Sequence, residues 1–342
     1  MRLGPSLETT WAATVDCELV AYRAGRVLAT AIPNTDSLLE VSAGNMPAEK
    51  LTFTAPRDWT PTSPYDPLNN YGQELGVTVR MVADGVPWHV NMGRYMVTGW
   101  AEKTGGVQVT AVGLLQRLVE NPAVWPSSPP AGATLYSEAR RLAPGLPIRL
   151  HARDRGIPRT FEWGTSRVEA LQELCDSYGL DMLIRADGYL HLVPHRDGGS
   201  PDITYRDVVI EAPRESVNRR ANQWIVYGKE TDGVQPIAIT TADEAPYDPG
   251  SYGRLVEHHQ MSIAEDQSAV TAAAGTYMRK RLNAARKRSI SVRPDPRIEI
   301  GDIIQAISDT EIVTGRVTGY SLPLVAGTSK TDMRIDVEEL QW

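Results

Sequence analysis

The spacing of apolar residues along positions 161–194 predicts a helix followed by a β-hairpin. In the first part, apolar residues recur at steps of three and four, so they share one face of a helix. These residues are Val168, Leu171, Leu174, Cys175 and Tyr178. Ser166 and Glu169 stand three positions apart before this run, as in a capping box, and Gly179 stands where a left-handed C-cap residue belongs.

The pattern then changes to a period of two, which is typical of strands. Residues 181–186 and 189–194 flank the dipeptide Asp187-Gly188, which favours a two-residue type I′ turn. Nothing in this helix and hairpin supplies a nucleophile or a set of metal ligands. We therefore interpret the unit as structural, with Leu174 in its core and Gly188 required by the turn.

The first 121 residues contain short runs of alternating polarity, which is typical of a β-barrel or a β-sandwich. Val15, Cys17, Leu19 and Ala21 alternate with mostly polar neighbours and predict the first strand. The other predicted strands are 27–32, 51–55, 75–83, 88–90, 95–100 and 107–112. Prolines at 56, 61, 64 and 67 interrupt the pattern and indicate a long loop.

A Pro-rich linker at 122–132 precedes a small α/β module, which begins with a short helix after Thr134. Strand-like patterns return from about residue 203 to the end. They are interrupted by a helix near 267–286, whose apolar face carries Ala274, Met278, Leu282 and Ala285. We therefore divide the chain into 1–121, 122–210 and 211–342. The expected fold is mainly β, with an inserted α/β module.

A short internal repeat links the two β regions. The sequence VTGW at 97–100 has a counterpart in VTGY at 317–320, and a Gly-Arg pair precedes each of them. The match is consistent with a chain that contains two versions of one barrel.

The composition is that of a globular protein with room for two or three cores, since 42% of its 342 residues are hydrophobic and 23% are charged. The N-terminus lacks the apolar core of a signal peptide, and no run approaches the ~18 apolar residues of a membrane span. We therefore expect synthesis in the cytoplasm and no membrane anchor. Cys17 and Cys175 fall on apolar faces and are expected to be buried, reduced thiols.

Motifs for catalysis and cofactor binding do not occur in the sequence. It has no Walker loop, dinucleotide fingerprint or Gly-x-Ser-x-Gly elbow, and two cysteines are too few for a thiolate zinc site. His191 and His195 stand four apart, but Pro194 disturbs the strand geometry that would let both bind one metal ion. Paired carboxylates such as Glu338-Glu339 lack a recognisable cleft. We therefore expect no enzymatic activity, no metal and no cofactor.

One stretch is strongly basic, because no acidic residue occurs between Asp266 and Asp295. Six of its cations form pairs seven positions apart, which places them on one broad face of the predicted helix. They are Arg279, Lys280, Arg281, Arg286, Lys287 and Arg288. Three interpretations stay open: a solvated face near the helix C-terminus, contact with an acidic neighbouring subunit, and direct contact with DNA. The net charge of −7 argues against a general nucleic-acid-binding surface.

The helix and hairpin resemble a unit of the hub proteins of bacteriophage tails and contractile injection machines, the late-control-D-like baseplate hubs. The matching positions are Trp163, Ser166, Leu171, Leu174, Tyr178, Gly179, Asp187, Gly188 and Leu190. Residues 217–228 (VNRRANQWIVYG) resemble the first strand of that family's second barrel, and residues 296–304 (PRIEIGDII) resemble a turn within it. The order of these motifs carries the resemblance.

The resemblance implies two hub-type β-barrels with the α/β module between them. It implies a homotrimer at the tail tip of the virion, in which six barrels form a pseudo-sixfold ring. Such a ring joins the tail tube to central spike or fibre proteins. It also holds the end of the tape-measure protein and lets viral DNA pass during ejection.

Only six of the 35 cationic residues are lysines, as in proteins encoded by GC-rich genomes. This skew suits an actinobacterial host. Together with it, the resemblance implies a minor tail protein of a flexible-tailed phage, a siphophage. Two alternatives stay open: the hub of a contractile injection system, and a receptor- or carbohydrate-binding protein of the tail tip. The aromatic residues that would serve the latter, Trp59, Tyr65 and Tyr71, surround the Pro-rich loop.

Overall fold

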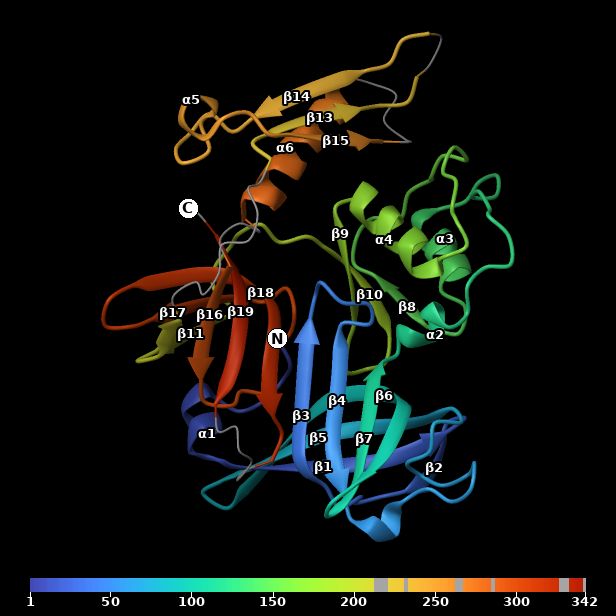
Figure 1. The fold of residues 1–342 in the computed structure, drawn as a ribbon, viewed down its shortest axis with the longest axis vertical. Helices are drawn as coiled ribbons and strands as arrows, with labels where there is room; N and C mark the ends of the chain where they lie inside the picture. Colours follow the sequence, from blue (N-terminus) through green and yellow to red (C-terminus); the bar gives the residue numbers. More distant parts are fainter. Residues whose placement is uncertain (212–220, 231–232, 262–266, 284–286, 326–331, 341–342) are drawn as a thin grey trace.

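The computed structural model describes residues 1–211, 221–230, 233–261, 267–283, 287–325 and 332–340, without the side chains of Ala269 and of residues 279–283. Figure 1 shows a broad β-structure, with its first half in blue to teal-green and the last strands of its second half in red. A small α/β module lies beside it in green, and a second small unit of helix and sheet lies above it in orange. The fold is mainly β with α/β insertions, as the sequence predicts.

The first half of the β-structure is built from the N-terminal third of the chain. Its elements are α1 (Leu7–Ala12), β1 (Thr14–Arg23), β2 (Arg26–Ala29), β3 (Thr35–Ser42), β4 (Glu49–Ala55), the 3-10 turn η1 (Arg57–Trp59), β5 (Gln73–Ala83), β6 (Val86–Lys103), β7 (Gly106–Gly113) and α2 (Gln116–Val119). Strand β1 buries Cys17, Leu19 and Ala21, as the alternation predicts. The two predicted strands at 88–90 and 95–100 are one long strand, β6, and β3 was not predicted.

The α/β module has its own core. Its elements are α3 (Leu135–Leu142), β8 (Ile148–Leu150), α4 (Arg167–Ser177), β9 (Leu180–Ile184) and β10 (Leu190–Pro194). The backbone N–H of Glu169 donates to Ser166 Oγ at 3.3 Å, so the predicted helix start is confirmed. Helix α4 buries Leu174 completely, and Gly179 has the expected positive φ of +64°.

The hairpin turn between β9 and β10 is not the predicted type I′ turn. Gly188 has a positive φ of +77°, but Asp187 does not. The N–H of Gly188 donates to the carbonyl of Arg185 (2.9 Å), and the N–H of Arg185 donates to the carbonyl of Tyr189 (3.2 Å). This is a three-residue loop, in which a type I turn precedes a left-handed glycine. A negative φ lets the Asp187 carboxylate accept the N–H of Tyr189 at 3.1 Å.

The second half of the β-structure is built from the C-terminal part of the chain. Its strands are β11 (Ile203–Arg206), β12 (Val209–Glu211), β16 (Lys287–Val292), β17 (Ile303–Ile307), β18 (Ile312–Pro323) and β19 (Met333–Glu339). An insert between β12 and β16 contains β13 (Gln223–Tyr227), β14 (Ile237–Thr241), α5 (Pro249–Tyr252), β15 (Val256–Gln260) and α6 (Gln267–Asn283). The insert forms its own three-stranded sheet, β14-β13-β15, packed against α6.

These positions correct two expectations. The predicted boundary at residue 210 is too late, because β11 and β12 pair with β17 and β16 of the second half. The segment 217–228 is not the first strand of the second half. Residues 217–220 lie outside the described residues, and the remainder forms β13 in the insert.

One continuous sheet runs through both halves (Figure 1). Its order is β12-β16-β19-β18-β3-β4-β7-β6-β5-β1-β2, and β17 and β11 branch from β18. The two halves join where β3 pairs with β18 in antiparallel register. Their apolar side chains form one shared core. Among the described strands, neither half closes into the barrel that the sequence predicts.

The two halves repeat the same arrangement. Five strands of the first half pair in the order β3-β4-β7-β6-β5, and five of the second pair in the order β12-β16-β19-β18-β17. All four pairings are antiparallel in both halves. The halves differ in the next strand, because β1 is antiparallel to β5 whereas β11 is parallel to β17.

The short sequence repeat marks equivalent residues in the two halves. The register shifts between Val97 and Gly99 in β6, and again between the matching residues of β18. The extra residue of the first bulge is Thr98, whose hydroxyl donates to the carbonyl of Thr110 (3.3 Å). The extra residue of the second bulge is Thr318, whose hydroxyl donates to the carbonyl of Asp336 (3.2 Å). The short sequence repeat therefore marks the same bulged strand pair in both halves, β6–β7 and β18–β19.

Candidate functional site

The N-terminal segment, the α/β module and both halves of the β-structure meet around one cleft, with a volume of about 270 Å³. Arg2 of the N-terminal segment, Glu49 of β4 and Tyr95 of β6 line it. Met182 of β9 and Arg316 of β18 line it as well. Because side chains from distant parts of the sequence converge here, we take this junction as the candidate functional site.

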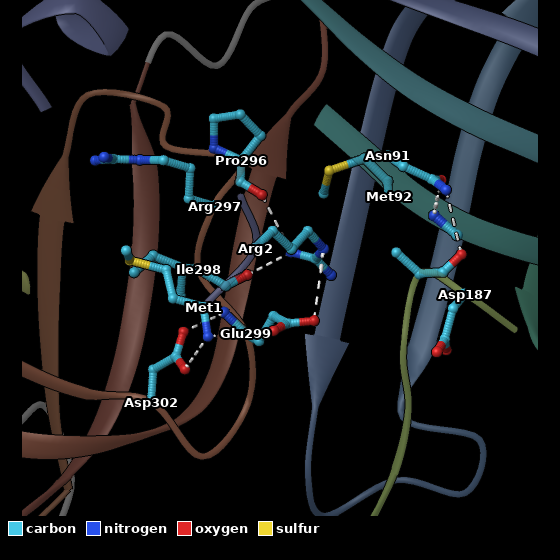
Figure 2. Close-up of polar contacts among 12 residues, drawn as sticks. Met1, Arg2, Asn91, Met92, Asp187, Pro296, Arg297, Ile298, Glu299 and Asp302 are labelled. Atoms are coloured by element: carbon cyan, nitrogen blue, oxygen red, sulfur yellow. Dashed lines mark hydrogen bonds and ion pairs between the residues drawn. The ribbon is translucent and has the colours of Figure 1, made fainter. Parts of the chain in front are cut away.

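Arg2 ties the N-terminal segment to the loop 296–302 of the second half, and Figure 2 shows its side chain directed at that loop. Its guanidinium donates to the carbonyls of Pro296 (3.2 Å) and Ile298 (2.5 Å). It also donates to the hydroxyl of Tyr320 at 3.2 Å. One side chain near the N-terminus therefore holds a loop nearly three hundred residues further along the chain.

The loop 296–302 is the turn that the resemblance predicted. Gly301 has a positive φ of +86°, and the N–H of Glu299 donates to Asp302 Oδ2 at 2.8 Å. The N–H of Gly301 in turn donates to the carbonyl of Val317 on β18 (2.9 Å). The turn therefore has hydrogen bonds within itself and to β18, in addition to those from Arg2.

A buried ion pair lies behind this loop. Arg297 and Asp295 are 5% and 0% exposed, and two hydrogen bonds of 2.8 and 2.7 Å join them. Arg297 also donates to the carbonyl of Pro5 (2.7 Å), and the hydroxyl of Tyr205 donates to Asp295 (3.0 Å). The ring of Trp11 stacks on Tyr205. The N-terminal segment, which also contacts β5 of the first half, is thus bound to the second half as well.

Glu49 is the unusual carboxylate of the cleft. Burial raises the pKa of its carboxyl to about 7, although its own backbone N–H and the charge of Arg2 act in the opposite direction. Its Oε2 is buried and has no hydrogen-bond partner among the described residues. A Cβ on residue 113 would lie only 2.1 Å from this oxygen, which is too close for two unbonded atoms. The lack of a side chain at Gly113 therefore leaves room for the Glu49 carboxyl.

Arg316 of β18 links the second half to the α/β module. Its guanidinium donates to Asp181 Oδ2 of β9 (3.0 Å), and Glu338 of β19 lies 3.7 Å away. The other oxygen of Asp181 lies 2.7 Å from His195 Nδ1, and Asp197 lies 3.0 Å from His195 Nε2. A chain of hydrogen bonds and ion pairs therefore crosses from the second half to the α/β module.

The turn of the hairpin rests on the first half. Asn91 Nδ2 of β6 donates to the carbonyl of Ala186 at 3.3 Å, and Figure 2 shows Asn91 facing the turn beside Asp187. Met92 is the extra residue of a bulge in β6, and Gly93 follows it with a φ of +108°. A Cβ on Gly93 would lie 3.4 Å from the backbone of Ala186. The bulge in β6 and Gly93 thus form the surface on which the turn of the hairpin packs.

The chemistry of the junction is that of hydrogen bonds and ion pairs between parts of the chain. Among the described residues, no group of three or more His, Cys, Asp or Glu side chains could hold a metal ion. His191 contacts His151 at 2.8 Å and Asp187 at 3.1 Å, so it and His195 do not share one site. The arrangement fixes the relative positions of four structural parts: the N-terminal segment, the α/β module and the two halves of the β-structure.

The predicted basic face is not one helical surface. Helix α6 ends at Asn283, and β16 begins at Lys287, so Lys287 and Arg288 lie on a strand. Arg288 forms an ion pair with Glu311. Arg279, Lys280 and Arg281 belong to α6, but their side chains, and Arg286 altogether, lie outside the described part of the chain. The structure therefore places five of these six cations on two different elements, and the predicted subunit contact stays a prediction.

The Pro-rich loop does not present three aromatic side chains together. Trp59 packs against the core of the first half, whereas Tyr65 and Tyr71 are 67% and 60% exposed. The guanidinium of Arg23 lies over the ring of Tyr65. The aromatic surface that would favour carbohydrate binding is therefore reduced to two tyrosines.

Sequence reasoning missed the residues of the junction. Arg2 and Glu49 stand in no local motif, and Arg316 belongs to the Gly-Arg pair before the second copy of the repeat, which gave no sign of its partners. One signal was available for Asp295 and Arg297: two charged residues, with a proline between them, stand directly before the apolar turn 298–304.

No protein-family model and no curated protein matches the sequence. The fold, in contrast, is similar to solved structures of phage tail proteins. A tail protein from Neisseria meningitidis MC58 matches with a TM-score of 0.64 and 14% identity, over 95% of this chain and 97% of that chain. The tail protein of prophage MuSo2 from Shewanella oneidensis matches with a TM-score of 0.60 and 12% identity, over 94% and 98% of the two chains.

A chain of the Francisella PdpA–VgrG complex matches with a TM-score of 0.50 and 9% identity. The match covers 96% of this protein but 58% of that chain. The protein therefore has the fold of phage tail proteins, shared along nearly its whole length with the two tail proteins. No helix among the described residues is long and apolar enough to cross a membrane.

Proposed function

We propose that this protein is the hub of a phage tail: a structural component of the tail tip and not an enzyme. Three copies form a ring in which two similar β-structures per copy give a pseudo-sixfold arrangement. The ring joins the sixfold tail tube to a spike or fibre apparatus, and its lumen passes the genome during ejection.

The observation that carries the proposal is the internal duplication. Two five-stranded sheets with the same strand order stand side by side in one chain, joined edge to edge. A ring of three such chains presents six similar units, and closed symmetry lets the same interface repeat without forming a fibre. The similarity in fold to two tail proteins over nearly their whole length supports the same function.

The junction suits this function. A hub transmits force between a tube and a spike, so its parts must keep their relative positions. The contacts of Arg2, Arg316 and Asn91 connect the N-terminal segment, the module and both halves. The partners of the ring are the tube proteins above, the C-terminus of the tape-measure protein within, and spike or fibre proteins below. The fold similarity to a VgrG-containing complex supports a spike partner.

The host, one with a GC-rich genome, is proposed on composition alone, and the siphophage is proposed on the resemblance of the sequence motifs. The same fold would serve the hub of a contractile injection system, and a sheath gene beside this one would favour that machine. The receptor-binding alternative loses support, because Trp59 is partly buried against the core and does not stand with Tyr65 and Tyr71 on an exposed surface.

Imaging of intact tails tests the proposal. We expect density for three copies below the tail tube, each contributing two similar β-structures around a channel. Six copies, one β-structure per chain, or a location on peripheral fibres would contradict it. Antibody labelling of the protein on purified virions gives an independent measure of its position.

A further inference from the structure

The cleft between the α/β module and the two halves contains a cation without a counter-charge. Arg185 lines it where β9 ends, and its side chain is half-buried. Its Nε is buried and has no hydrogen-bond acceptor, and its guanidinium forms no ion pair with any other residue in the described part of the chain. A buried polar group without a partner costs free energy, so an acceptor from outside the chain would stabilise this one.

The backbone of Arg185 is fixed, although its side chain has no partner among the described residues. Its N–H donates to the carbonyl of Tyr189 (3.2 Å), and its carbonyl accepts from the N–H of Gly188 (2.9 Å). The carbonyl of the next residue, Ala186, accepts from Asn91 of β6 (3.3 Å). The hairpin and the first half thus hold the base of the side chain at the cleft. A donor positioned in advance loses less freedom when a ligand binds.

The carboxylates that line the cleft do not pair with Arg185. Several lie next to a different basic side chain: Asp181, Asp197, Glu299 and Glu338. Asp176 of α4 is not free either, and Glu49 interacts with the charge of Arg2. The positive charge of Arg185 is therefore not neutralised from within the described part of the chain.

The imidazole of His151 is affected by this excess of positive charge. Its Nε2 lies 2.8 Å from Nδ1 of His191, and the two rings stack. Partial desolvation lowers the pKa of His151, and the charges of His191, Arg185 and Arg149 lower it further. The charge of Asp187 acts in the opposite direction but does not outweigh them. This end of the module therefore favours an anion as its ligand.

The walls of the cleft indicate which kind of anion fits. Met92, Met182 and Leu183 are among its apolar residues, and its volume of about 270 Å³ is near the lower end for ligand sites. The cleft therefore suits one or two side chains. A guanidinium binds a carboxylate through two parallel hydrogen bonds. The net charge of −7 repels a polyanion such as nucleic acid over a long range, but it opposes a single carboxylate less.

We propose that the cleft binds an acidic peptide segment of a partner protein, in which the carboxylate of a glutamate pairs with Arg185 and the neighbouring apolar side chains contact Met182 and Leu183. The same chemistry occurs within the chain, because Arg316 donates to Asp181 in this cleft at 3.0 Å. The site goes beyond the proposed function, since it does not depend on a ring of three copies.

Two matched peptides test the site. In the probe acetyl-Leu-Glu-Leu-amide, one carboxylate stands between two apolar side chains. In the control acetyl-Leu-Gln-Leu-amide, an amide of the same shape replaces it. Isothermal titration at low salt should show the control binding at least about tenfold more weakly, because it lacks the charge-assisted hydrogen bonds. No binding of the glutamate peptide at millimolar concentration, or equal binding of the two peptides, would overturn the inference.

Substitutions at Arg185 assign the binding to its guanidinium. Arg185→Gln should remove the preference for the glutamate peptide, whereas Arg153→Gln, at an exposed position of the module outside the cleft, should keep it. Both variants should melt like the parent, because neither side chain has an ion pair to lose among the described residues. Arg185→Glu should instead bind acetyl-Leu-Lys-Leu-amide, through the reversed pair. Undiminished binding of the glutamate peptide by Arg185→Gln would contradict the site.

The pKa of His151, followed by NMR, gives a second readout. It should rise in Arg185→Gln, and it should rise in the parent protein when the glutamate peptide binds, because both changes remove the effect of one positive charge. A pKa that stays the same in both cases would show that the ligand does not lie beside Arg185, and the inference would be wrong.

Inorganic phosphate and a short DNA strand are the competing ligands. Tighter binding of either one than of the glutamate peptide would assign the cleft to phosphate groups and overturn the acidic-peptide inference. Failure of the peptide to bind would leave the hub proposal intact, because the imaging of tails tests that proposal separately.

Discussion

Arg297 and Asp295 form a two-pronged ion pair that is almost entirely removed from solvent, with Nε 2.8 Å from Oδ1 and Nη2 2.7 Å from Oδ2. The pair also binds the carbonyl of Pro5 and the hydroxyl of Tyr205. It therefore connects the N-terminal segment to the second half of the β-structure through one buried network.

Asp295→Asn should lower the free energy of unfolding by about 3–5 kcal/mol, because it leaves the Arg297 charge buried without a counter-charge. Chemical denaturation measures the change. Arg334→Gln is the control, since Arg334 and Asp336 form an exposed pair and such pairs contribute about 0–1 kcal/mol. Equal effects of the two substitutions would show that the buried network does not stabilise the fold.

Leu174→Ala should lower the free energy of unfolding by about 2–5 kcal/mol, because the side chain is fully buried in the core of the module. Glu173→Ala is the matched control on the same helix, where the side chain is exposed. Thermal unfolding followed by circular dichroism measures both. A Leu174→Ala protein that melts like the control would contradict the packing of α4 described above.

Gly188→Val should cost roughly 1–3 kcal/mol, because the backbone at this position has φ +77°, which a β-branched residue rarely adopts. Gly188→Asn should cost less, since asparagine tolerates the left-handed region. Comparing the melting temperatures of the two variants shows whether the loss comes from the backbone conformation at residue 188 or from steric clashes of any added side chain. Equal losses from valine and asparagine would exclude the backbone explanation.

Glu49 should make stability depend on pH. Burial raises the pKa of its carboxyl from 4.5 to about 7, so between these values the folded protein holds a proton that the unfolded chain has released. The free energy of unfolding therefore falls as the pH rises through this window, by at most ~3 kcal/mol. Glu49→Gln, which cannot ionise, should lack this part of the decrease. Parallel pH profiles of the two proteins between pH 4.5 and 8 would refute the assignment.

Local features of the fold follow from local sequence signals. Ser166, the apolar face of α4 and Gly179 stand close together in the chain, and each occupies its predicted place. The hairpin was predicted correctly, but its turn type was wrong. Asp187-Gly188 favours a type I′ turn in isolation, whereas here the Asp187 carboxylate contacts Tyr189 and His191 and keeps its own φ negative.

Strand β3, which joins the two halves of the sheet, has no clear strand pattern in the sequence. Leu39 and Val41 alternate inward as in any strand, but Ser37 is also buried and is polar. Its hydroxyl donates to Asn34 Oδ1, and a bulge with a positive φ at Asp36 breaks the alternation one residue earlier. In the sequence, a serine next to a break in the alternation is typical of a loop. The strand β3, which joins the two halves, was therefore not predicted.

The junction could not be predicted because its partners are far apart in sequence. Arg316 and Asp181 are separated by 135 positions, and Arg2 and Ile298 by 296. Neither pair shares a motif or a period, so the contact depends on how the halves and the module pack. The repeat at 97–100 and 317–320 was the exception, since the same bulge requires the same short sequence twice.

The packing of the N-terminal segment has a consequence for biosynthesis. Residues near position 2 leave the ribosome early, yet the loop that binds them is not made until about residue 300. During translation the first segment must therefore wait for almost three hundred further residues, while β1 and β5 beside it can already pair. Contacts between such distant positions form late and slowly. A truncated product that ends before residue 296 would lack the docking surface for its own beginning, so quality-control proteases would meet it with that segment exposed.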